Sequence, residues 1–477
     1  SSNYLIIERK TSLLCLSRGL LSTIRHCGAY RWIHTDIYSA THAMGCCCRA
    51  GSSWLTTPRL IMNAATLNFR PIFNMCYMSF HRNNTSSPTA SYSRRWYKSG
   101  SRGGISQEHE IVRHWVQGDA LPGGKHHEER FTVASYNILG DRNVSNHGDL
   151  YRNVPPAYLD WDHRRRVICE ELLGLNPDII CLQEVDKYND LLNILEKAGY
   201  LGSYKRRTGG SVDGCAMFWK ADKFQLLEGE SVEFRQHGLR DNVAQLSVFE
   251  MREAKSRRLV VGNIHVLYNP NRGDVKLGQI RFLASRAHIL SEKWDHVPIV
   301  LSPIYKFLSS SELNLMLHNR KELSGQRLCH PSQVLGLRRE KGILFVLMDR
   351  FFNSRWSDEE INVAIGALKS HIAMHPLKLN SSYAMVKGPL TTRDNSGEPL
   401  ATSFHSKFLG TVDYLWYSDG LAPTKVLDTL PINVLKKTGG LPYKKLGSDH
   451  LALVSEFAFL EVIGATEDRL SVKGDIC

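Results

Sequence analysis

Short apolar runs of strand type alternate with segments of helical periodicity along residues 108–459. Residues 131–139 alternate apolar and polar side chains as a half-buried strand does, and residues 178–184 (DIICLQE) read as a short buried strand. Between them, residues 162–175 carry apolar side chains at helical spacing and end before Pro177. This alternation predicts a single α+β domain that is rich in strands.

The same pattern continues to the end of the domain. No repeat with a period of about 20–50 residues is visible, and in particular there is no array of leucine-rich repeats. Further strands are expected at residues 214–219, 259–266, 298–301, 411–417 and 452–459, and further helices at residues 276–293 and 358–371.

The front of the chain has a different composition. The first 100 residues hold twelve Lys/Arg and two acidic residues, whereas the rest of the chain holds 48 basic and 45 acidic residues, so most of the net charge of +13 belongs to the front. Residues 83–106 are dense in Ser, Gly and Arg, which is typical of a linker. We therefore expect a basic, largely disordered leader over residues 1–107, a folded domain over residues 108–459 and a short tail over residues 460–477.

Composition also limits where the chain works. No uninterrupted apolar run reaches about 18 residues, so no membrane span is expected. The eleven cysteines include no metal-type CxxC pair in the core, which favours a reduced compartment without disulfides. We expect the cytoplasm, the nucleus or both. The alternative is import into mitochondria or plastids, because the Ser- and Arg-rich, acid-poor leader also has the composition of a transit peptide.

Polar residues occupy the positions where the expected strands end. Such positions carry function more often than core positions do. Taken singly, each residue also has a structural reading, because a strand-end Asn caps turns, a Glu after a strand is often solvated, and a His in a strand is often half-buried. The residues are Asn137 in SYNIL, Glu184 in LQEV, His265 in GNIHV, Asp413 in TVDYLWY, and Asp449 with His450 in SDHLALV.

Together these residue types suit magnesium-dependent hydrolysis of a phosphodiester. Mg²⁺ prefers carboxylate oxygens and keeps waters for the substrate phosphate, which makes Glu184 the expected ligand. The charge that develops on the phosphate needs imidazole and amide donors, so we expect His265 and His450 there, with Asp413 or Asp449 orienting an imidazole. A zinc site is disfavoured because close His/Cys spacing is absent, and a Ser-His-Asp hydrolase because GxSxG is absent.

The motifs SYNIL, LQEV, GNIHV, TVDYLWYS and GSDHLALV, in this order, resemble those of the endonuclease/exonuclease/phosphatase superfamily. The stretches YLDWDHRRRVICEELLGLNPDIICLQEVD, DGCAMFWK and HVLYNP give a closer resemblance to the carbon catabolite repressor-type poly(A) deadenylases, especially those of plants. The resemblance covers residues 128–458. It implies a DNase I-like fold, a four-layer α/β sandwich of two packed mixed β-sheets flanked by helices. It also implies Mg²⁺-dependent removal of 3′-terminal adenosines from mRNA poly(A) tails, with release of AMP.

The resemblance assigns the metal and the phosphate to particular residues. By motif match, Asn137 and Glu184 serve the metal site, and His265 and His450 hold the scissile phosphate. Asp413 is placed beside the metal or the phosphate.

It also assigns residues around the substrate. Asp449 would orient the histidine that follows it, and Asn263 joins the substrate-binding residues. The family stacks a target base between a proline and a phenylalanine, which correspond to Pro270 and Phe408. Stacking of this kind contributes about 1–3 kcal/mol per base. The RNA 3′ end is therefore the implied partner.

One departure from the family concerns catalysis directly. The family carries a Gly-Asp-x-Asn motif after a strand like VPIVL, but here residues 297–301 run straight into SPIY at residues 302–305. Asp295 lies before the strand, at its wrong end. The missing Asp would align or deprotonate the attacking water, and a general base contributes about 10²–10⁴ in rate. The chain as written is therefore expected to have little or no nuclease activity.

Two alternatives stay open beside the deadenylase. The first is a nucleotide phosphatase or 2′,5′-phosphodiesterase of the same superfamily, and the second is a catalytically inactive homologue that still binds RNA. The founding members of the family also carry leucine-rich repeats that dock them on the larger deadenylase complex. Because this chain shows no such repeats, the resemblance does not extend to stable docking there.

Overall fold

The computed structural model describes residues 111–119, 129–302, 306–310, 312–324, 329–336, 356–367 and 370–460. All of them belong to the second of the two units, residues 1–101 and 102–477, into which the chain divides. The leader expected at residues 1–107 and the tail expected from residue 460 lie outside the described residues, apart from residue 460 itself. Among the described residues, no helix combines the length and the apolar character that crossing a membrane requires.

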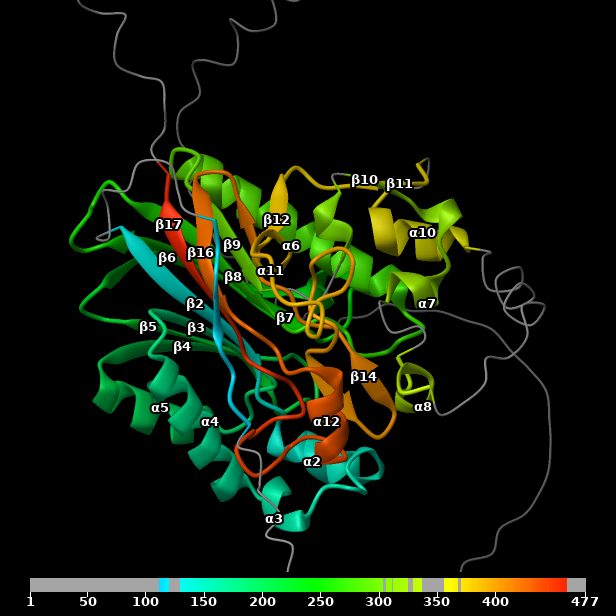
Figure 1. Cartoon of the computed structure of the whole chain (residues 1–477). Coiled ribbons are helices and arrows are strands. Elements are labelled where there is room, and N and C mark those ends of the chain that lie inside the picture. The colour runs from blue at the N-terminus through cyan, green and yellow to red at the C-terminus, as the bar shows by residue number, and fades with distance from the viewer. Residues whose placement is uncertain are drawn as a thin grey trace, which may run out of the picture. The chain divides into compact units, whose positions relative to one another are not determined.

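Two mixed β-sheets form the centre of the domain (Figure 1). In the first sheet only the β2–β3 pair is parallel, and in the second only the β8–β9 pair is. The first sheet has the order β1 (Trp115–Gln117), β16 (Leu421–Leu427), β17 (Leu453–Phe459), β2 (Arg130–Asn137), β3 (Ile179–Gln183), β5 (Gly214–Lys220) and β4 (Tyr200–Arg206). The second has the order β12 (Leu379–Ser381), β15 (Trp416–Ser418), β9 (Ile299–Ser302), β8 (Arg258–Ile264), β7 (Val243–Met251) and β6 (Phe224–Glu233).

Helices cover the outer faces of both sheets. The first sheet is covered by α4 (Trp161–Leu175) and α5 (Tyr188–Leu195), and the second by α6 (Gly273–Lys293), against which α10 (Asp358–Ile365) packs (Figure 1). The shorter elements are α2 (Asp141–Asn146), η1 (Gly148–Leu150), α3 (Pro156–Leu159), η2 (Glu196–Ala198), η3 (Phe234–His237), η4 (Lys306–Ser309), β10 (Glu312–Asn314), η5 (Leu315–Leu317), α7 (Arg320–Leu323), α8 (Pro331–Val334), β11 (Ile372–Met374), α11 (Ser382–Met385), β13 (Ser403–His405), β14 (Phe408–Gly410) and α12 (Ile432–Thr438).

The two sheets pack face to face through apolar side chains. Phe131 and Ile179 of the first sheet meet Val261 and Val300 of the second in one fully buried cluster. Side chains on one strand point alternately to opposite faces, so the neighbouring residues of the same strands face the helices instead. Burial of apolar surface on both faces of each sheet accounts for the four layers. The fold expected from the sequence, a DNase I-like α/β sandwich, is confirmed.

Most expected elements are present, but one helix ends earlier and one strand begins later than expected. The helix expected at residues 358–371 stops at Ile365, because Gly366 takes a left-handed conformation with φ of 75° that ends the helix. The strand expected at residues 411–417 begins only at Trp416. Before it, the backbone N–H groups of Val412 and Asp413 both donate to the Thr402 hydroxyl at 3.1 Å. A side-chain acceptor here takes the place of a strand partner.

The two parallel strand pairs end beside each other. Ser135 of β2 and Ser302 of β9 share a short hydrogen bond between their hydroxyl groups. Gln183 of β3 donates to the Asn263 side chain of β8 at 2.9 Å. These buried polar contacts join the carboxyl ends of the parallel pairs, where the loops carry the candidate site residues.

Candidate active site

Glu184 is the residue that follows β3, and its backbone is strained. Its φ of 58° lies in the left-handed region, which is uncommon for a residue with a side chain and costs about 1–3 kcal/mol. The conformation turns the carboxylate toward the end of β2. There it accepts hydrogen bonds from Asn137 Nδ2 at 2.9 Å, Asn143 Nδ2 at 2.6 Å and Gly140 N at 3.2 Å. Strain held by three donors at a strand end is typical of a functional site.

The environment of Glu184 keeps its carboxyl group ionised. Burial alone would raise the pKa, but the nearby His265 and the hydrogen bonds from Asn137 and Asn143 outweigh it, so the pKa is lowered. The side chain is 14% exposed, which leaves it reachable from solvent. A fixed, ionised oxygen ligand at the edge of a buried site is suited to a hard divalent cation.

Arg164, on α4, holds the loop that presents the donors to Glu184. Its guanidinium is fully buried and donates to the carbonyl oxygens of Ile138 at 3.0 Å, Leu139 and Leu159. Leu139 itself has a φ of 56°. The sequence reasoning assigned no role to Arg164.

His265 lies directly after β8 and faces the Glu184 carboxylate. Its Nε2 is 3.5 Å from Glu184 Oε1, and its Nδ1 is 3.9 Å from Asp213 Oδ2. Within the described part of the chain, neither Nδ1 nor Asp213 Oδ2 has a hydrogen-bond partner. Burial would raise the pKa of Asp213, but its interaction with His265 and the charge of Arg207 lower it. Asp213 therefore lies beside the imidazole at ion-pair distance rather than hydrogen-bond distance, and the sequence reasoning missed it although it quoted the DGCAMFWK stretch.

His450 forms the second histidine–carboxylate pair. Its Nδ1 is 2.8 Å from Asp413 Oδ2. Burial alone would lower the pKa of His450, but the charge of Asp413 and its hydrogen bond, with Asp449 and Glu184 further away, raise it to about 9. At neutral pH this imidazole is a cation, which can bind a phosphate oxygen.

Asp449 has a different place from the one expected. The resemblance predicted that it orients His450, but that is the position of Asp413, so this prediction is wrong. The Asp449 carboxylate instead accepts from the Tyr151 hydroxyl at 3.0 Å. The backbone explains the difference, because the Asp449 carbonyl accepts from Phe404 N at 2.9 Å and the segment runs beside β13.

Asn263 is also placed differently from its expected role. The residue is 0% exposed, and its amide donates to the carbonyl oxygens of Leu182 at 3.0 Å and Ala216 at 2.9 Å. Its own oxygen accepts from Gln183. A side chain whose hydrogen bonds all join strands cannot also bind substrate, so the substrate role is replaced by one in joining the two sheets.

Of the two residues expected to stack a base, one lies in a turn and the other on a short strand. Pro270 is exposed in the turn between β8 and α6, and its carbonyl accepts from the Ser324 hydroxyl at 2.6 Å. Phe408 lies on β14, with its ring 5.9 Å from that of His405. The stacking of a base between them stays a prediction.

The donor set fits a metal such as Mg²⁺ better than zinc. Among the described residues, no group of three or more His, Cys, Asp or Glu side chains could hold a metal ion, so a closed protein cage is absent there. Mg²⁺ commonly takes one or two carboxylates and fills the rest of its shell with water and substrate oxygens. Glu184, supported by Asn137, matches that chemistry, and a bound divalent cation would supply positive charge beside the scissile phosphate.

The end of β9 is where the family's missing motif would begin. Ser302, its last residue, is buried, and its hydroxyl is 3.3 Å from Gln183 Nε2, next to Glu184 in the chain. The motif would therefore enter the site at this point. Asp295 precedes β9, at the opposite end of the strand, and so cannot replace the missing Asp.

Comparisons with known proteins identify the family of the chain. The profile of the Endonuclease/Exonuclease/phosphatase family matches residues 134–293. The chain is 58% identical to carbon catabolite repressor protein 4 homolog 3 of Arabidopsis thaliana, over 83% of this chain and 91% of that protein. It is 44% identical to homolog 5 of the same plant, over 70% of this chain and 78% of that protein.

A solved structure is similar as well. The crystal structure of ANGEL2, a 2′,3′-cyclic phosphatase, in complex with adenosine-2′,3′-vanadate matches 73% of this chain and 99% of that chain, with 30% identity and a TM-score of 0.58. The fold and these similarities agree: the chain belongs to the endonuclease/exonuclease/phosphatase family of hydrolases, among the carbon catabolite repressor protein 4 homologues.

Proposed function

We propose that the chain acts on the 3′ end of RNA as a Mg²⁺-dependent 3′→5′ exoribonuclease that shortens poly(A) and releases AMP. The observation that carries the proposal is the convergence of two histidine–carboxylate pairs and the strained Glu184 at one edge of the sheets. Similarity to the carbon catabolite repressor protein 4 homologues supports it.

The reaction needs little from the protein beyond charge and orientation. Water attacks the phosphorus, the bond from phosphorus to the preceding 3′ oxygen breaks, that oxygen takes a proton, and AMP leaves. His450, as an imidazolium, binds a phosphate oxygen and neutralises the charge that grows on it. His265, which lies beside Asp213, donates to a second oxygen.

The chain as it stands lacks the group that would activate the water. The described residues after β9 supply no Asp or Asn at its end, where Ser302 is already bonded to Gln183. We therefore infer that cleavage by this chain is slower by about 10²–10⁴ than by a form that carries Gly-Asp-x-Asn after Leu301. Binding of the RNA end does not require the missing residues and is expected to persist.

A second candidate function follows from the similarity to ANGEL2. Hydrolysis of a terminal 2′,3′-cyclic phosphate needs the same charge neutralisation, but the water attacks a phosphate that has no further nucleotide attached. The two histidine–carboxylate pairs suit either substrate.

One set of RNA substrates separates these functions. The full chain and its Gly-Asp-x-Asn insertion variant are incubated with oligo(A), oligo(U) and oligo(A) ending in a 2′,3′-cyclic phosphate, with and without Mg²⁺. We expect stepwise AMP release from oligo(A) by the insertion variant, and binding with release slower by about 10²–10⁴ by the chain as it stands. Equal activity on oligo(U) would refute a preference for poly(A). Hydrolysis of the 2′,3′-cyclic phosphate without AMP release would favour the second candidate function.

A further inference from the structure

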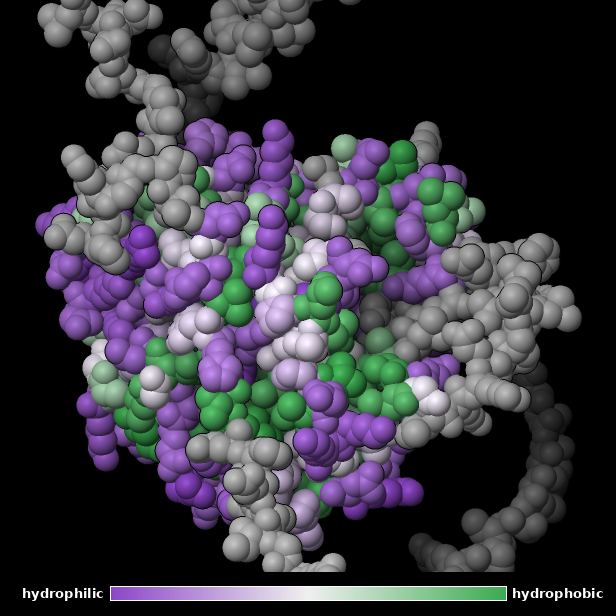
Figure 2. Space-filling view, in the orientation of Figure 1, coloured by the Kyte–Doolittle hydropathy of each residue, from purple (hydrophilic) through white to green (hydrophobic). Residues whose placement is uncertain are grey.

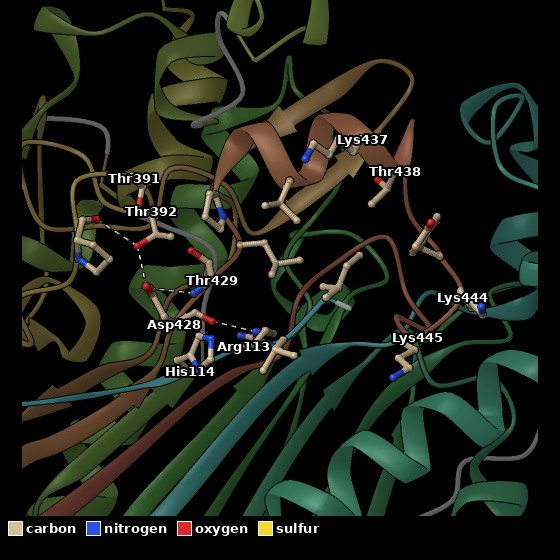
Figure 3. Close-up of a pocket in the computed structure, with 17 residues that line it drawn as sticks. Arg113, His114, Thr391, Thr392, Asp428, Thr429, Lys437, Thr438, Lys444 and Lys445 are labelled. Carbon is tan, nitrogen blue, oxygen red and sulfur yellow. Dashed lines mark hydrogen bonds between the residues drawn. The ribbon is translucent and has the colours of Figure 1, made fainter. Parts of the chain in front are cut away.

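A groove of about 970 Å³ lies outside the candidate active site (Figure 3). Its walls come from segments far apart in the chain: the residues before β1, the loop after α11, the link between β16 and α12, α12 itself, and the segment that leads to Asp449. Figure 3 places Thr391, Thr392 and Thr429 on one side and Lys437, Lys444 and Lys445 on the other. We call it the Thr429 groove.

The charge of the Thr429 groove favours an anion. The acidic lining residue is Asp428, and the basic ones are Arg113, which is paired with Glu171 at 3.2 Å, and three lysines. Asp428 is already neutralised, because its Oδ1 is 2.5 Å from Arg393 Nη1 and its Oδ2 accepts from the Thr392 hydroxyl at 2.8 Å. A groove with lysines on one side therefore presents positive potential to a ligand.

Thr429 gives a second, independent indication of a ligand. The residue is 3% exposed, and its backbone N–H donates to Asp428 Oδ1 at 2.9 Å. Its hydroxyl, in contrast, has no hydrogen-bond partner among the described residues. Buried hydroxyl groups are almost always paired in folded proteins, so an orphan on the wall of a groove calls for a partner from outside the chain.

The groove also has surfaces on which a ring can stack. Pro389, Pro431 and Tyr443 lie among its lining residues. Figure 2 shows apolar side chains gathered around α12 and β14 on the face drawn, with hydrophilic ones around them. Positive charge together with apolar and aromatic surface is the combination that binds single-stranded nucleic acid without reading its sequence.

The Thr429 groove is close to the candidate active site along the chain. Lys445 and Asp449 are four residues apart, so even a fully extended backbone separates them by at most about 14 Å. A stacked strand advances about 3.4 Å per nucleotide, so about four nucleotides span that distance. An RNA whose 3′ end lies at His450 can therefore reach the groove with the nucleotides upstream.

We propose that the Thr429 groove binds the RNA strand upstream of the 3′ end that enters the active site, with its lysines on the phosphates and the Thr429 hydroxyl on a phosphate or sugar oxygen. The proposal rests on the proposed function and deepens it, because it makes affinity depend on RNA length. An oligo(A) of four nucleotides fills the active site alone, and one of twelve fills both.

The test is binding of 5′-fluorescein-labelled A4 and A12 to the full chain, measured by anisotropy without metal. Lys437, Lys444 and Lys445 are changed together to Gln. The matched control changes three other exposed lysines, Lys197, Lys255 and Lys378, to Gln.

The groove variant is expected to bind A12 at least about tenfold more weakly while A4 is unaffected, and the slope of log K against log salt should fall by about 2. Thr429→Val should weaken A12 about threefold without lowering Tm, because it removes an unpaired hydroxyl. The control triple variant should match the wild type.

Each result decides something. If the groove variant keeps the wild-type preference for A12 and the wild-type salt slope, the proposal is overturned; a groove that binds a peptide would give this result. An equal loss of A12 affinity in the control variant also overturns it. Groove-dependent binding of A12 without any binding of A4 would refute the proposed function and leave the groove intact. Failure to bind either RNA refutes both.

Discussion

Arg164→Met removes the buried cation that holds the loop after β2. Three hydrogen bonds from the guanidinium to Ile138, Leu139 and Leu159 are lost, and three buried carbonyls lose their donor. Hydrogen bonds to charged groups contribute about 1.5–3 kcal/mol each. The net loss is smaller than the sum of the three, because the structure relaxes around Met and the variant no longer has the cost of burying a cation. We expect a loss of about 3–5 kcal/mol in the free energy of unfolding.

Thermal unfolding measures this loss directly. For a domain of this size, about 3–5 kcal/mol lowers Tm by roughly 4–7 °C. Arg165→Met is the matched control, because the Arg165 side chain is 35% exposed and pairs with Asp162 at 3.0 Å on the surface, an interaction that contributes at most about 1 kcal/mol. Equal Tm values for the two variants would refute the reasoning. In the insertion variant, Arg164→Met should also slow cleavage, because the loop carries the donors to Glu184.

Three further predictions concern the site. Glu184→Gln in the insertion variant should lower Mg²⁺-dependent AMP release by at least about 100-fold without lowering Tm, and unchanged release would remove Glu184 from the metal site. Asp213→Asn should lower kcat by about 10² with little change in KM, because His265 loses the carboxylate beside it; a change in KM alone would contradict that role. Asp413→Asn tests the pKa of about 9 for His450. The stability that the His450–Asp413 pair contributes is fully present below pH 6.5 and is lost as pH rises through about 9. The difference in Tm between wild type and variant, measured in EDTA, should therefore shrink between these two pH values. A difference in Tm that stays constant would disprove the coupling.

Periodicity and strand-end positions predicted much of the architecture. The strands of residues 131–139, 178–184 and 259–266 follow from apolar alternation or short buried runs, and each ends near a site residue. The helix that ends before Gly366 shows the limit of this reasoning. The apolar pattern of the sequence continues beyond Gly366, although this residue ends the helix.

Other parts of the site depend on tertiary contacts that no pattern reports. Glu184 adopts a left-handed backbone that its residue type disfavours, so only the surrounding donors explain it. Arg164 is fully buried although arginine is mostly exposed, and Asn263 looked like a site residue while its amide joins the two sheets. The pairing of His450 with Asp413 rather than Asp449 likewise depends on how β13 lies beside the segment that precedes β17.

Shortening of 5′-labelled A12 under single-turnover conditions, which reports the release of each AMP, tests the central claim most directly. The full chain, the form with Gly-Asp-x-Asn inserted after Leu301, and that form carrying Glu184→Gln are compared with and without Mg²⁺. The account predicts that the insertion accelerates stepwise release by about 10²–10⁴ and that Glu184→Gln abolishes the gain. Equal rates for the chain with and without the insertion, or full activity of the Glu184→Gln form, would contradict it.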